Sequence, residues 1–141
     1  MQGPKLYVFT AAQVVGFGVL AWLLVTIKTP WNTERYVGTV FAIVGATFIV
    51  IARFHLGRSF SVTPQARKLI TTGIYSRIRN PIYVFGSVML AGLFLVLQRS
   101  ELWILLVVLV VAQTIRAKKE ARVLEAAFGE EYREYRRKTW F

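Results

Sequence analysis

Residues 73–86 gather polar and aromatic side chains directly in front of a long apolar run. Around Pro81 lie Arg79, Asn80 and Tyr83. Proline lacks a backbone N–H and disfavours helix at the residue before it, so the chain turns here and the next helix starts with unpaired donors. Polar groups at a membrane edge are costly unless they bind something. The pattern predicts the edge of a pocket for a polar ligand; the alternative is a basic cap with tyrosine at the lipid headgroups.

A second polar stripe lies near the end of the following apolar run. Gln113, Arg116 and Glu120 are spaced i, i+3 and i+7, which puts them on one helix face, and Leu124 continues that face. An amide such as Gln113 is costly in an apolar run unless it faces protein or a cavity. The stripe predicts one wall of a site. The alternative is an interfacial Arg–Glu pair together with a hydrogen bond between helices.

Four apolar runs must position these residues: 6–27, 36–52, 82–97 and 102–115. With 55% hydrophobic residues and a mean hydropathy of +0.49, the chain is unlike an ordinary soluble domain. The first run exceeds the roughly 20 residues of a membrane span, and the short linker 98–101 makes the last two runs a helical hairpin. We therefore expect an all-α integral membrane bundle of about four transmembrane helices, forming a single domain over residues 1–141.

The net charge of +11 is distributed unevenly between these runs. If the chain crosses four times, all basic residues except Lys28, Arg35 and Arg99 fall on one side. The excess of Lys and Arg predicts that this side, with both termini and the loop 53–80, is cytoplasmic, and a bacterial inner membrane fits this topology. Because the basic residues flank apolar runs, anionic lipid headgroups are the expected partner, and nucleic acid is not.

The sequence has no cysteine, and its single histidine is His55. Thiol nucleophiles, zinc–thiolate sites and histidine-rich metal sites are therefore excluded, and no metal is expected.

Two further features concern packing. Gly38, Ala42 and Ala46 recur at four-residue spacing, which lets helix backbones approach closely. Packing within the chain is the preferred explanation, and a homodimer through this face is the weaker one. Towards the end of the chain, Gly129 predicts a helix break, after which the pattern is typical of an amphipathic interfacial helix.

The two polar stripes belong to a longer pattern. It runs Gly73-x-Tyr75-x-x-x-Arg79-Asn80-Pro81-x-Tyr83 and then Glu120-x-x-x-Leu124-x-x-x-Phe128-Gly129-x-x-Tyr132-x-x-Tyr135. This pattern resembles the isoprenylcysteine carboxyl methyltransferase family, whose phospholipid methyltransferase relatives share the same C-terminal core. The resemblance covers residues 53–137 and includes the segment 56–61, whereas the earlier runs match only in being hydrophobic.

The resemblance implies S-adenosylmethionine as cofactor, bound on the cytoplasmic side by the turn at Pro81 and the helix that carries Glu120. Together with the polar stripes, it gives these predicted cofactor contacts: Tyr75, Asn80, Pro81, Tyr83, Gln113, Glu120 and Leu124. The predicted catalytic residues are Arg79, Arg116 and Glu120. The carboxylate would anchor the ribose or the amino group, a tyrosine ring would face the sulfonium, and an arginine would hold a carboxylate of cofactor or acceptor.

Three positions depart from the family pattern. Asn80 stands in place of the usual histidine, Ala121 in place of a second glutamate, and Phe85 where a glycine is expected. An amide does not titrate near neutral pH. A carboxylate acceptor needs no base, whereas an ammonium acceptor must first lose a proton. The loss of titratable groups therefore favours carboxyl O-methylation of a lipid-like, isoprenylcysteine-type substrate.

Other functions remain open from the sequence. N-methylation of an aminophospholipid is the nearest. An NADPH-dependent, sterol-type reductase is more distant, since such reductases resemble the same core. A non-catalytic four-helix membrane scaffold would bind no cofactor at all.

Overall fold

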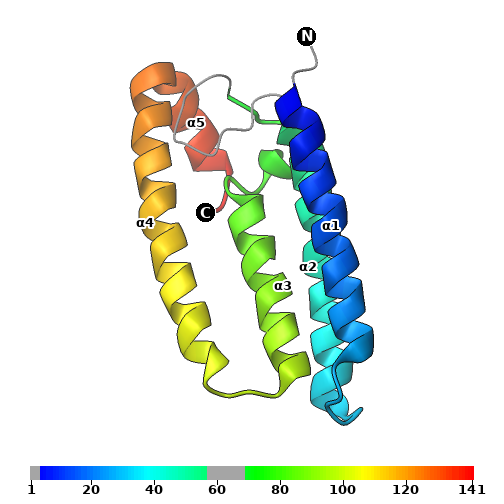
Figure 1. The fold of residues 1–141 in the computed structure, drawn as a ribbon. Coiled ribbons are helices and arrows are strands. Elements are labelled where there is room, and N and C mark those ends of the chain that lie inside the picture. The colour runs from blue at the N-terminus through cyan, green and yellow to red at the C-terminus, as the bar shows by residue number, and fades with distance from the viewer. Residues whose placement is uncertain (1–3, 57–68) are drawn as a thin grey trace.

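The computed structural model describes residues 4–56 and 69–141, and the regular structure of this part of the chain is helical (Figure 1). In chain order the elements are α1 (Pro4–Thr26), α2 (Thr33–Leu56), the short 3₁₀ helix η2 (Gly73–Ser76), α3 (Pro81–Leu97), α4 (Leu102–Phe128) and α5 (Glu130–Lys138). The axes of the four long helices run in similar directions, and the start of α1, η2 and α5 lie at one end (Figure 1). The all-α class is confirmed.

The helix boundaries follow local sequence signals. Pro81 occupies the first turn of α3, where its missing N–H costs nothing. Gln98 ends α3 in the left-handed conformation, with φ of 54°. Gly129 separates α4 from α5 at φ of 54°, and its N–H donates to the carbonyl of Glu125 at 2.8 Å. The predicted break at Gly129 is therefore confirmed. Helix α4 continues past its apolar run to Phe128.

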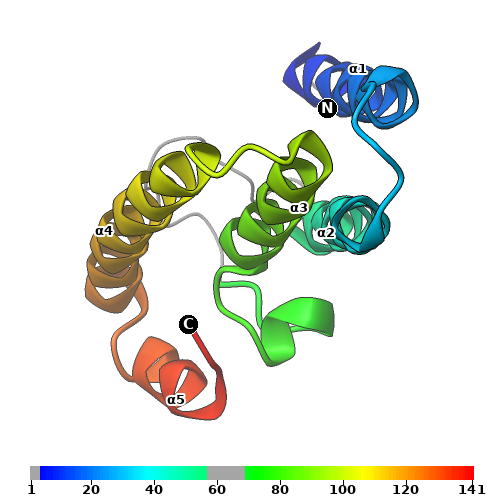
Figure 2. The same cartoon turned by 90° about the horizontal axis from the view of Figure 1, so that it is seen from below.

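The tightest packing joins α2 to α3. A Cβ on Gly38 would lie 2.5 Å from the carbonyl oxygen of Gly92, and a Cβ on Gly45 would lie 2.5 Å from the N of Met89. Ala42 is fully buried at the same seam. Small residues let the two backbones approach this closely. The small-residue face is thus covered by α3 of the same chain, and α2 and α3 lie side by side in Figure 2.

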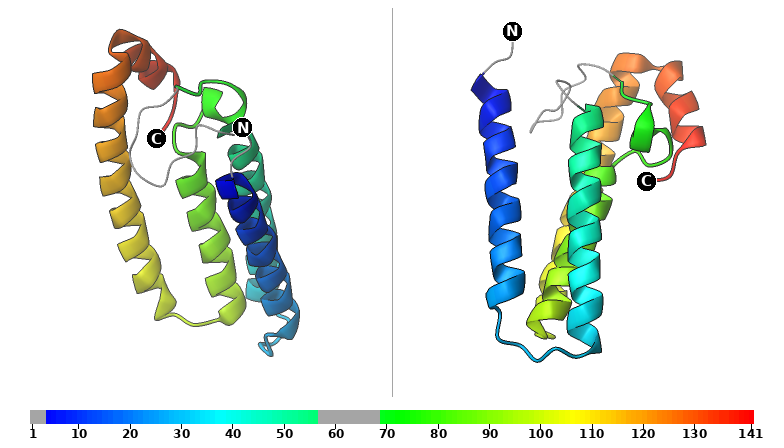
Figure 3. Two further views of the ribbon diagram at one scale, coloured as in Figure 1. Left: turned by 45° about the horizontal axis from the view of Figure 1, so that its top comes forward. Right: turned by 90° about the vertical axis from the view of Figure 1, so that its right-hand side faces the viewer.

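Helix α1 stands apart from the others over most of its length (Figures 2 and 3). It joins the bundle near its end, where Leu24 packs with Ala42 and Val96, and Leu20 and Ile27 lie against them.

Arg35 joins the end of α1 and the α1–α2 turn to the start of α2. Its side chain is 2% exposed, donates to the carbonyls of Thr29 and Leu24, and lies 4.0 Å from the centre of the Trp31 ring. The α1–α2 turn is also bonded to α3, since the Thr29 hydroxyl donates to the carbonyl of Val96 at 2.7 Å. A buried cation that satisfies two carbonyls therefore fixes α1 to α2.

Replacing Arg35 with methionine is expected to destabilise the protein by about 2–3 kcal/mol, because two carbonyls lose a charged donor. Unfolding in detergent, followed by circular dichroism, measures this change. Arg99→Met is the matched control: Arg99 pairs with Glu101 at the exposed α3–α4 turn, and such a pair contributes less than about 1 kcal/mol. Equal losses in the two variants would contradict the prediction.

By length and composition, one described helix, Thr33–Leu56, is able to cross a membrane. The apolar helices Thr10–Thr26 and Pro81–Leu97 are shorter, and the apolar part of α4 leads directly into Arg116, Lys118 and Lys119 within the same helix. The expected arrangement of four spans therefore stays a prediction.

Candidate functional site

Three polar side chains meet where the first turn of α3 faces α4. The Tyr83 hydroxyl donates to Oε1 of Glu120 at 2.7 Å, and Nε of Arg116 donates to the same oxygen at 3.0 Å. The Arg116 guanidinium lies 6.0 Å from the centre of the Tyr83 ring. Arg116 and Glu120 meet because they are one helical turn apart, and Tyr83 joins them from α3. We call these three residues the carboxylate cluster.

The carboxylate cluster holds Glu120 as an oriented acceptor. Both protein donors converge on Oε1, and in the described chain no residue donates to Oε2. The Glu120 side chain is 25% exposed, so a ligand can reach it. A carboxylate held in place by two donors is well suited to accept hydrogen bonds from hydroxyl or ammonium groups of a ligand.

One helical turn further along α3, Ser87 faces Gln113 of α4. The Ser87 hydroxyl oxygen lies 2.9 Å from Oε1 of Gln113 and 3.0 Å from the carbonyl oxygen of Tyr83. Gln113 thus has a hydrogen-bond partner on the neighbouring helix, in agreement with the alternative in which this amide bonds between helices. The polar contacts between α3 and α4 therefore extend from the Tyr83–Glu120 pair to the Ser87–Gln113 pair.

Tyr75, predicted to contact the cofactor, is buried in η2. Its carbonyl accepts a hydrogen bond from the Tyr135 hydroxyl at 2.7 Å, which joins η2 to α5. Burial raises the pKa of the Tyr75 hydroxyl. Gly73 begins η2 at φ of 61° and lies so close to His55 that a Cβ would meet the histidine ring. Tyr75 therefore positions elements around the site.

Arg79 and Asn80 are engaged with the segment that follows α4. The Arg79 guanidinium donates to the carbonyl of Arg136 on α5 at 3.1 Å, and no bond joins it to the carboxylate cluster in the residues described. The Asn80 N–H donates to the carbonyl of Phe141 at 2.9 Å. Pro81 is fully buried. The structure thus brings Arg116 and Glu120 together and places Arg79 elsewhere.

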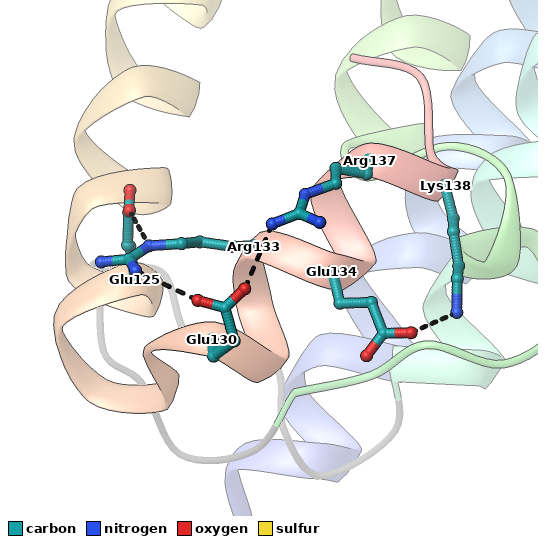
Figure 4. Close-up of polar contacts among 6 residues, drawn as sticks. All are labelled: Glu125, Glu130, Arg133, Glu134, Arg137 and Lys138. Atoms are coloured by element: carbon teal, nitrogen blue, oxygen red, sulfur yellow. Dashed lines mark hydrogen bonds and ion pairs between the residues drawn. The ribbon is translucent and has the colours of Figure 1, made fainter.

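Helix α5 is amphipathic as predicted, but its aromatic side faces the protein. Tyr132 is 2% exposed, and Tyr135 bonds to η2. The exposed side carries ion pairs (Figure 4), listed from the first turn onward: Arg133–Glu125 at 2.9 Å, Arg133–Glu130 at 3.1 Å, Arg137–Glu130 at 3.1 Å and Lys138–Glu134 at 2.6 Å. The tyrosines are therefore used for packing within the chain and do not serve as membrane anchors.

Tyr135 gives a pH dependence of stability. Burial raises its pKa from 10.0 to about 12. The unfolded chain then loses the tyrosine proton at lower pH than the folded protein, so this contribution to stability is complete below pH 10 and is lost as the pH rises towards 12. Unfolding in detergent between pH 8 and 12 is expected to show this decline. Tyr135→Phe should make the decline shallower, because the other buried tyrosines still contribute to it, and an identical slope in the variant would contradict the assignment.

A cavity of about 250 Å³ opens beside the carboxylate cluster, between α3 and α4. Tyr83, Val84 and Ser87 line it from α3, and Val110, Gln113 and Thr114 line it from α4. Trp140 and Phe141, which follow α5, complete the lining. The chain after α5 points back between α3 and α4 in Figure 2.

The family model for phospholipid methyltransferase matches residues 33–131, more than two-thirds of the chain. The chain belongs to the phospholipid methyltransferase family. Membership indicates a membrane methyltransferase that acts on lipid-like substrates. The match starts at the first residue of α2 and ends in the first turn of α5, so it includes the whole carboxylate cluster and leaves out α1 and residues 132–141. No curated protein and no solved structure matches the chain.

For this phospholipid methyltransferase family member, sequence patterns identified the cluster but missed part of its surroundings. Ser87 stands one turn after Tyr83 in an apolar run, and that spacing was an available signal. Nothing local pointed to Trp140 or Phe141. Leu124 is partly buried one turn beyond Glu120. Residues 57–61, part of the resemblance, lie outside the described residues.

Proposed function

We propose that this protein is an S-adenosylmethionine-dependent methyltransferase that O-methylates a lipid-like carboxylate, most closely of the isoprenylcysteine type. The observation that carries the proposal is the carboxylate cluster, which lies inside the family-matched segment and whose Tyr83 lines a cavity between two apolar helices. Beyond membership of the family, the proposal concerns two points, namely the identity of the cofactor and the class of the acceptor.

The residues present fit the cofactor. Glu120 keeps Oε2 for a ribose hydroxyl or the cofactor's amino group, while Tyr83 and Arg116 hold Oε1. Arg116 offers a positive charge to a carboxylate, and the Tyr83 ring offers an aromatic face to a cation. Once bound, S-adenosylmethionine supplies a methyl group already activated by its sulfonium. The task left to the chain is to align the acceptor and exclude water, and such positioning contributes several kcal/mol.

The nature of the cluster supports a carboxylate acceptor. Its one carboxylate is paired with Arg116, and Asn80 replaces a titratable histidine. A carboxylate acceptor is already a nucleophile at neutral pH, whereas an ammonium acceptor needs a base. Arg116 can orient such a carboxylate. N-methylation of an aminophospholipid is the second candidate, because the matching family model is that of phospholipid methyltransferases and fits either acceptor.

The exposed side chains favour a membrane position. Large apolar side chains cover the outer side of α4, among them Ile104, Val107 and Val111. Apolar surface on this scale is unusual on a soluble monomer. With the distribution of basic residues, it supports four spans, cytoplasmic termini and anionic lipid contacts in a bacterial inner membrane, with residues 1–141 as one domain. A homodimer remains a prediction.

Calorimetric titration of the detergent-purified protein with S-adenosylhomocysteine tests the proposal. A saturable heat is expected, and its absence would favour the non-catalytic scaffold. Methyl transfer from radiolabelled S-adenosylmethionine to a farnesylcysteine analogue, compared with phosphatidylethanolamine, then decides the acceptor. Label released by base indicates a carboxyl ester, and base-stable label in the lipid amine would overturn O-methylation.

A further inference from the structure

We propose that residues 139–141, which we call the aromatic strap, form the wall of the acceptor's chain-binding site and set which apolar chain fits. The inference rests on the proposed function and adds a specificity-determining segment. The strap lies outside the family-matched residues 33–131.

Backbone hydrogen bonds attach the strap to the turn that begins α3. The Trp140 N–H donates to the carbonyl of Arg77 at 2.7 Å, and the Arg79 N–H donates to the carbonyl of Trp140 at 2.9 Å. Asn80 adds the bond to Phe141 at 2.9 Å, and Ile78 pairs with Trp140 in a parallel bridge. Because the Asn80 carbonyl accepts from the Tyr83 N–H at 3.1 Å, the strap is connected directly to the turn that presents the cluster.

The strap holds two aromatic rings at the cavity. Trp140 and Phe141 have ring centres 5.9 Å apart, and both line the space between α3 and α4. Trp140 is 64% exposed, so most of its side-chain surface is left uncovered by packing within the chain. Val84 and Val110 line the same space. The lining is mainly apolar, and it shares Tyr83 with the carboxylate cluster.

An apolar cavity that continues from a polar cluster suits the first part of a lipid chain attached to a polar head. Whole small-molecule sites occupy roughly 300–1,000 Å³. The cavity here is about 250 Å³, so it takes the segment of chain next to the head, and the remainder extends towards the bilayer. Removing a ring from the strap would widen the part of the site that contacts the apolar chain, and so change which chain lengths and branching patterns fit.

Steady-state kinetics of the full chain in detergent, with farnesylcysteine and geranylcysteine analogues as acceptors, tests the strap. Trp140→Ala and Phe141→Ala are each expected to raise KM for the farnesyl analogue about tenfold, with kcat and S-adenosylhomocysteine affinity within twofold. Trp22→Ala is the matched control, since Trp22 is 63% exposed on α1. Unchanged KM values would overturn the proposal, and so would a parallel loss of S-adenosylhomocysteine affinity, which indicates a merely structural strap.

A second measurement does not depend on turnover. A farnesylcysteine analogue that carries a diazirine in its first isoprene unit is expected to label the peptide containing Trp140 or Phe141 on irradiation. Val110→Trp, which fills the cavity, should abolish this labelling. Labelling confined to α1, or undiminished in Val110→Trp, would overturn the proposal. If the wild type binds no S-adenosylhomocysteine, the proposed function fails, and the labelling result still decides whether the strap binds the chain.

Discussion

Replacing Glu120 with alanine is expected to weaken S-adenosylhomocysteine binding about 100-fold and to reduce methyl transfer at least as much. The substitution removes the acceptor for Tyr83 and Arg116 and the free oxygen proposed for the cofactor. Hydrogen bonds to charged groups contribute about 1.5–3 kcal/mol each, and about 3 kcal/mol corresponds to roughly 100-fold in affinity. Calorimetric titration and radiolabelled methyl transfer measure the two effects.

Glu125→Ala is the matched control for Glu120. Both glutamates are on α4 and both pair with arginine, but Glu125 pairs with Arg133 on the exposed side (Figure 4). Exposed pairs contribute little, so affinity within twofold of wild type is expected. Glu120→Gln keeps the shape of the side chain and removes its charge. Its affinity for S-adenosylhomocysteine should lie between those of the wild type and Glu120→Ala. Equal losses in the Glu120 and Glu125 variants would show that the cluster has no special role.

Replacing Gly92 with leucine is expected to prevent α2 and α3 from packing, and even Gly92→Ala should cost about 2–3 kcal/mol of stability. A Cβ on Gly92 would lie 2.4 Å from the N of Ala42 and 2.5 Å from the carbonyl oxygen of Gly38. The contacts are to backbone, so relief requires the helices to separate, and overpacking typically costs about 1–3 kcal/mol. Unfolding in detergent, followed by circular dichroism, gives the loss for alanine.

Gly86→Ala is the control on the same helix. A Cβ on Gly86 meets nothing within 4 Å, so alanine should leave the packing intact and add about 0.5–1 kcal/mol of helix stability. The contrast between two Gly→Ala changes in α3 separates packing from helix propensity. A wild-type melting temperature in Gly92→Ala would refute the close seam.

The sequence predicted the features that depend on neighbouring residues. Four apolar runs predicted the long helices, Pro81 and Gly129 marked helix boundaries, and the spacing of Arg116 and Glu120 placed both on one face of α4. These signals are local, because residues three or four apart on a helix are neighbours whatever the rest of the chain does. Two of the three residues of the cluster were therefore placed together before any tertiary contact.

Only the tertiary structure decided which partner each of the other groups meets. Arg79 was predicted to hold a carboxylate of the cofactor or the acceptor, and its guanidinium bonds to the carbonyl of Arg136 on α5. The segment after Gly129 was predicted to be an amphipathic interfacial helix, and its Tyr132 is buried against the protein. Trp140 gave no signal, because it reaches the cavity through bonds to residues more than sixty positions earlier.

The physical reason is that periodicity assigns a residue to a helix face and carries no information on how the helices are placed relative to one another. That placement depends on packing between distant segments, above all the contact of Gly38 with Gly92. The types and spacing of its residues thus determined this protein's helices and its Arg116–Glu120 pair. Joining that pair to Tyr83, and closing the cavity beside it with the aromatic strap, was decided by the fold.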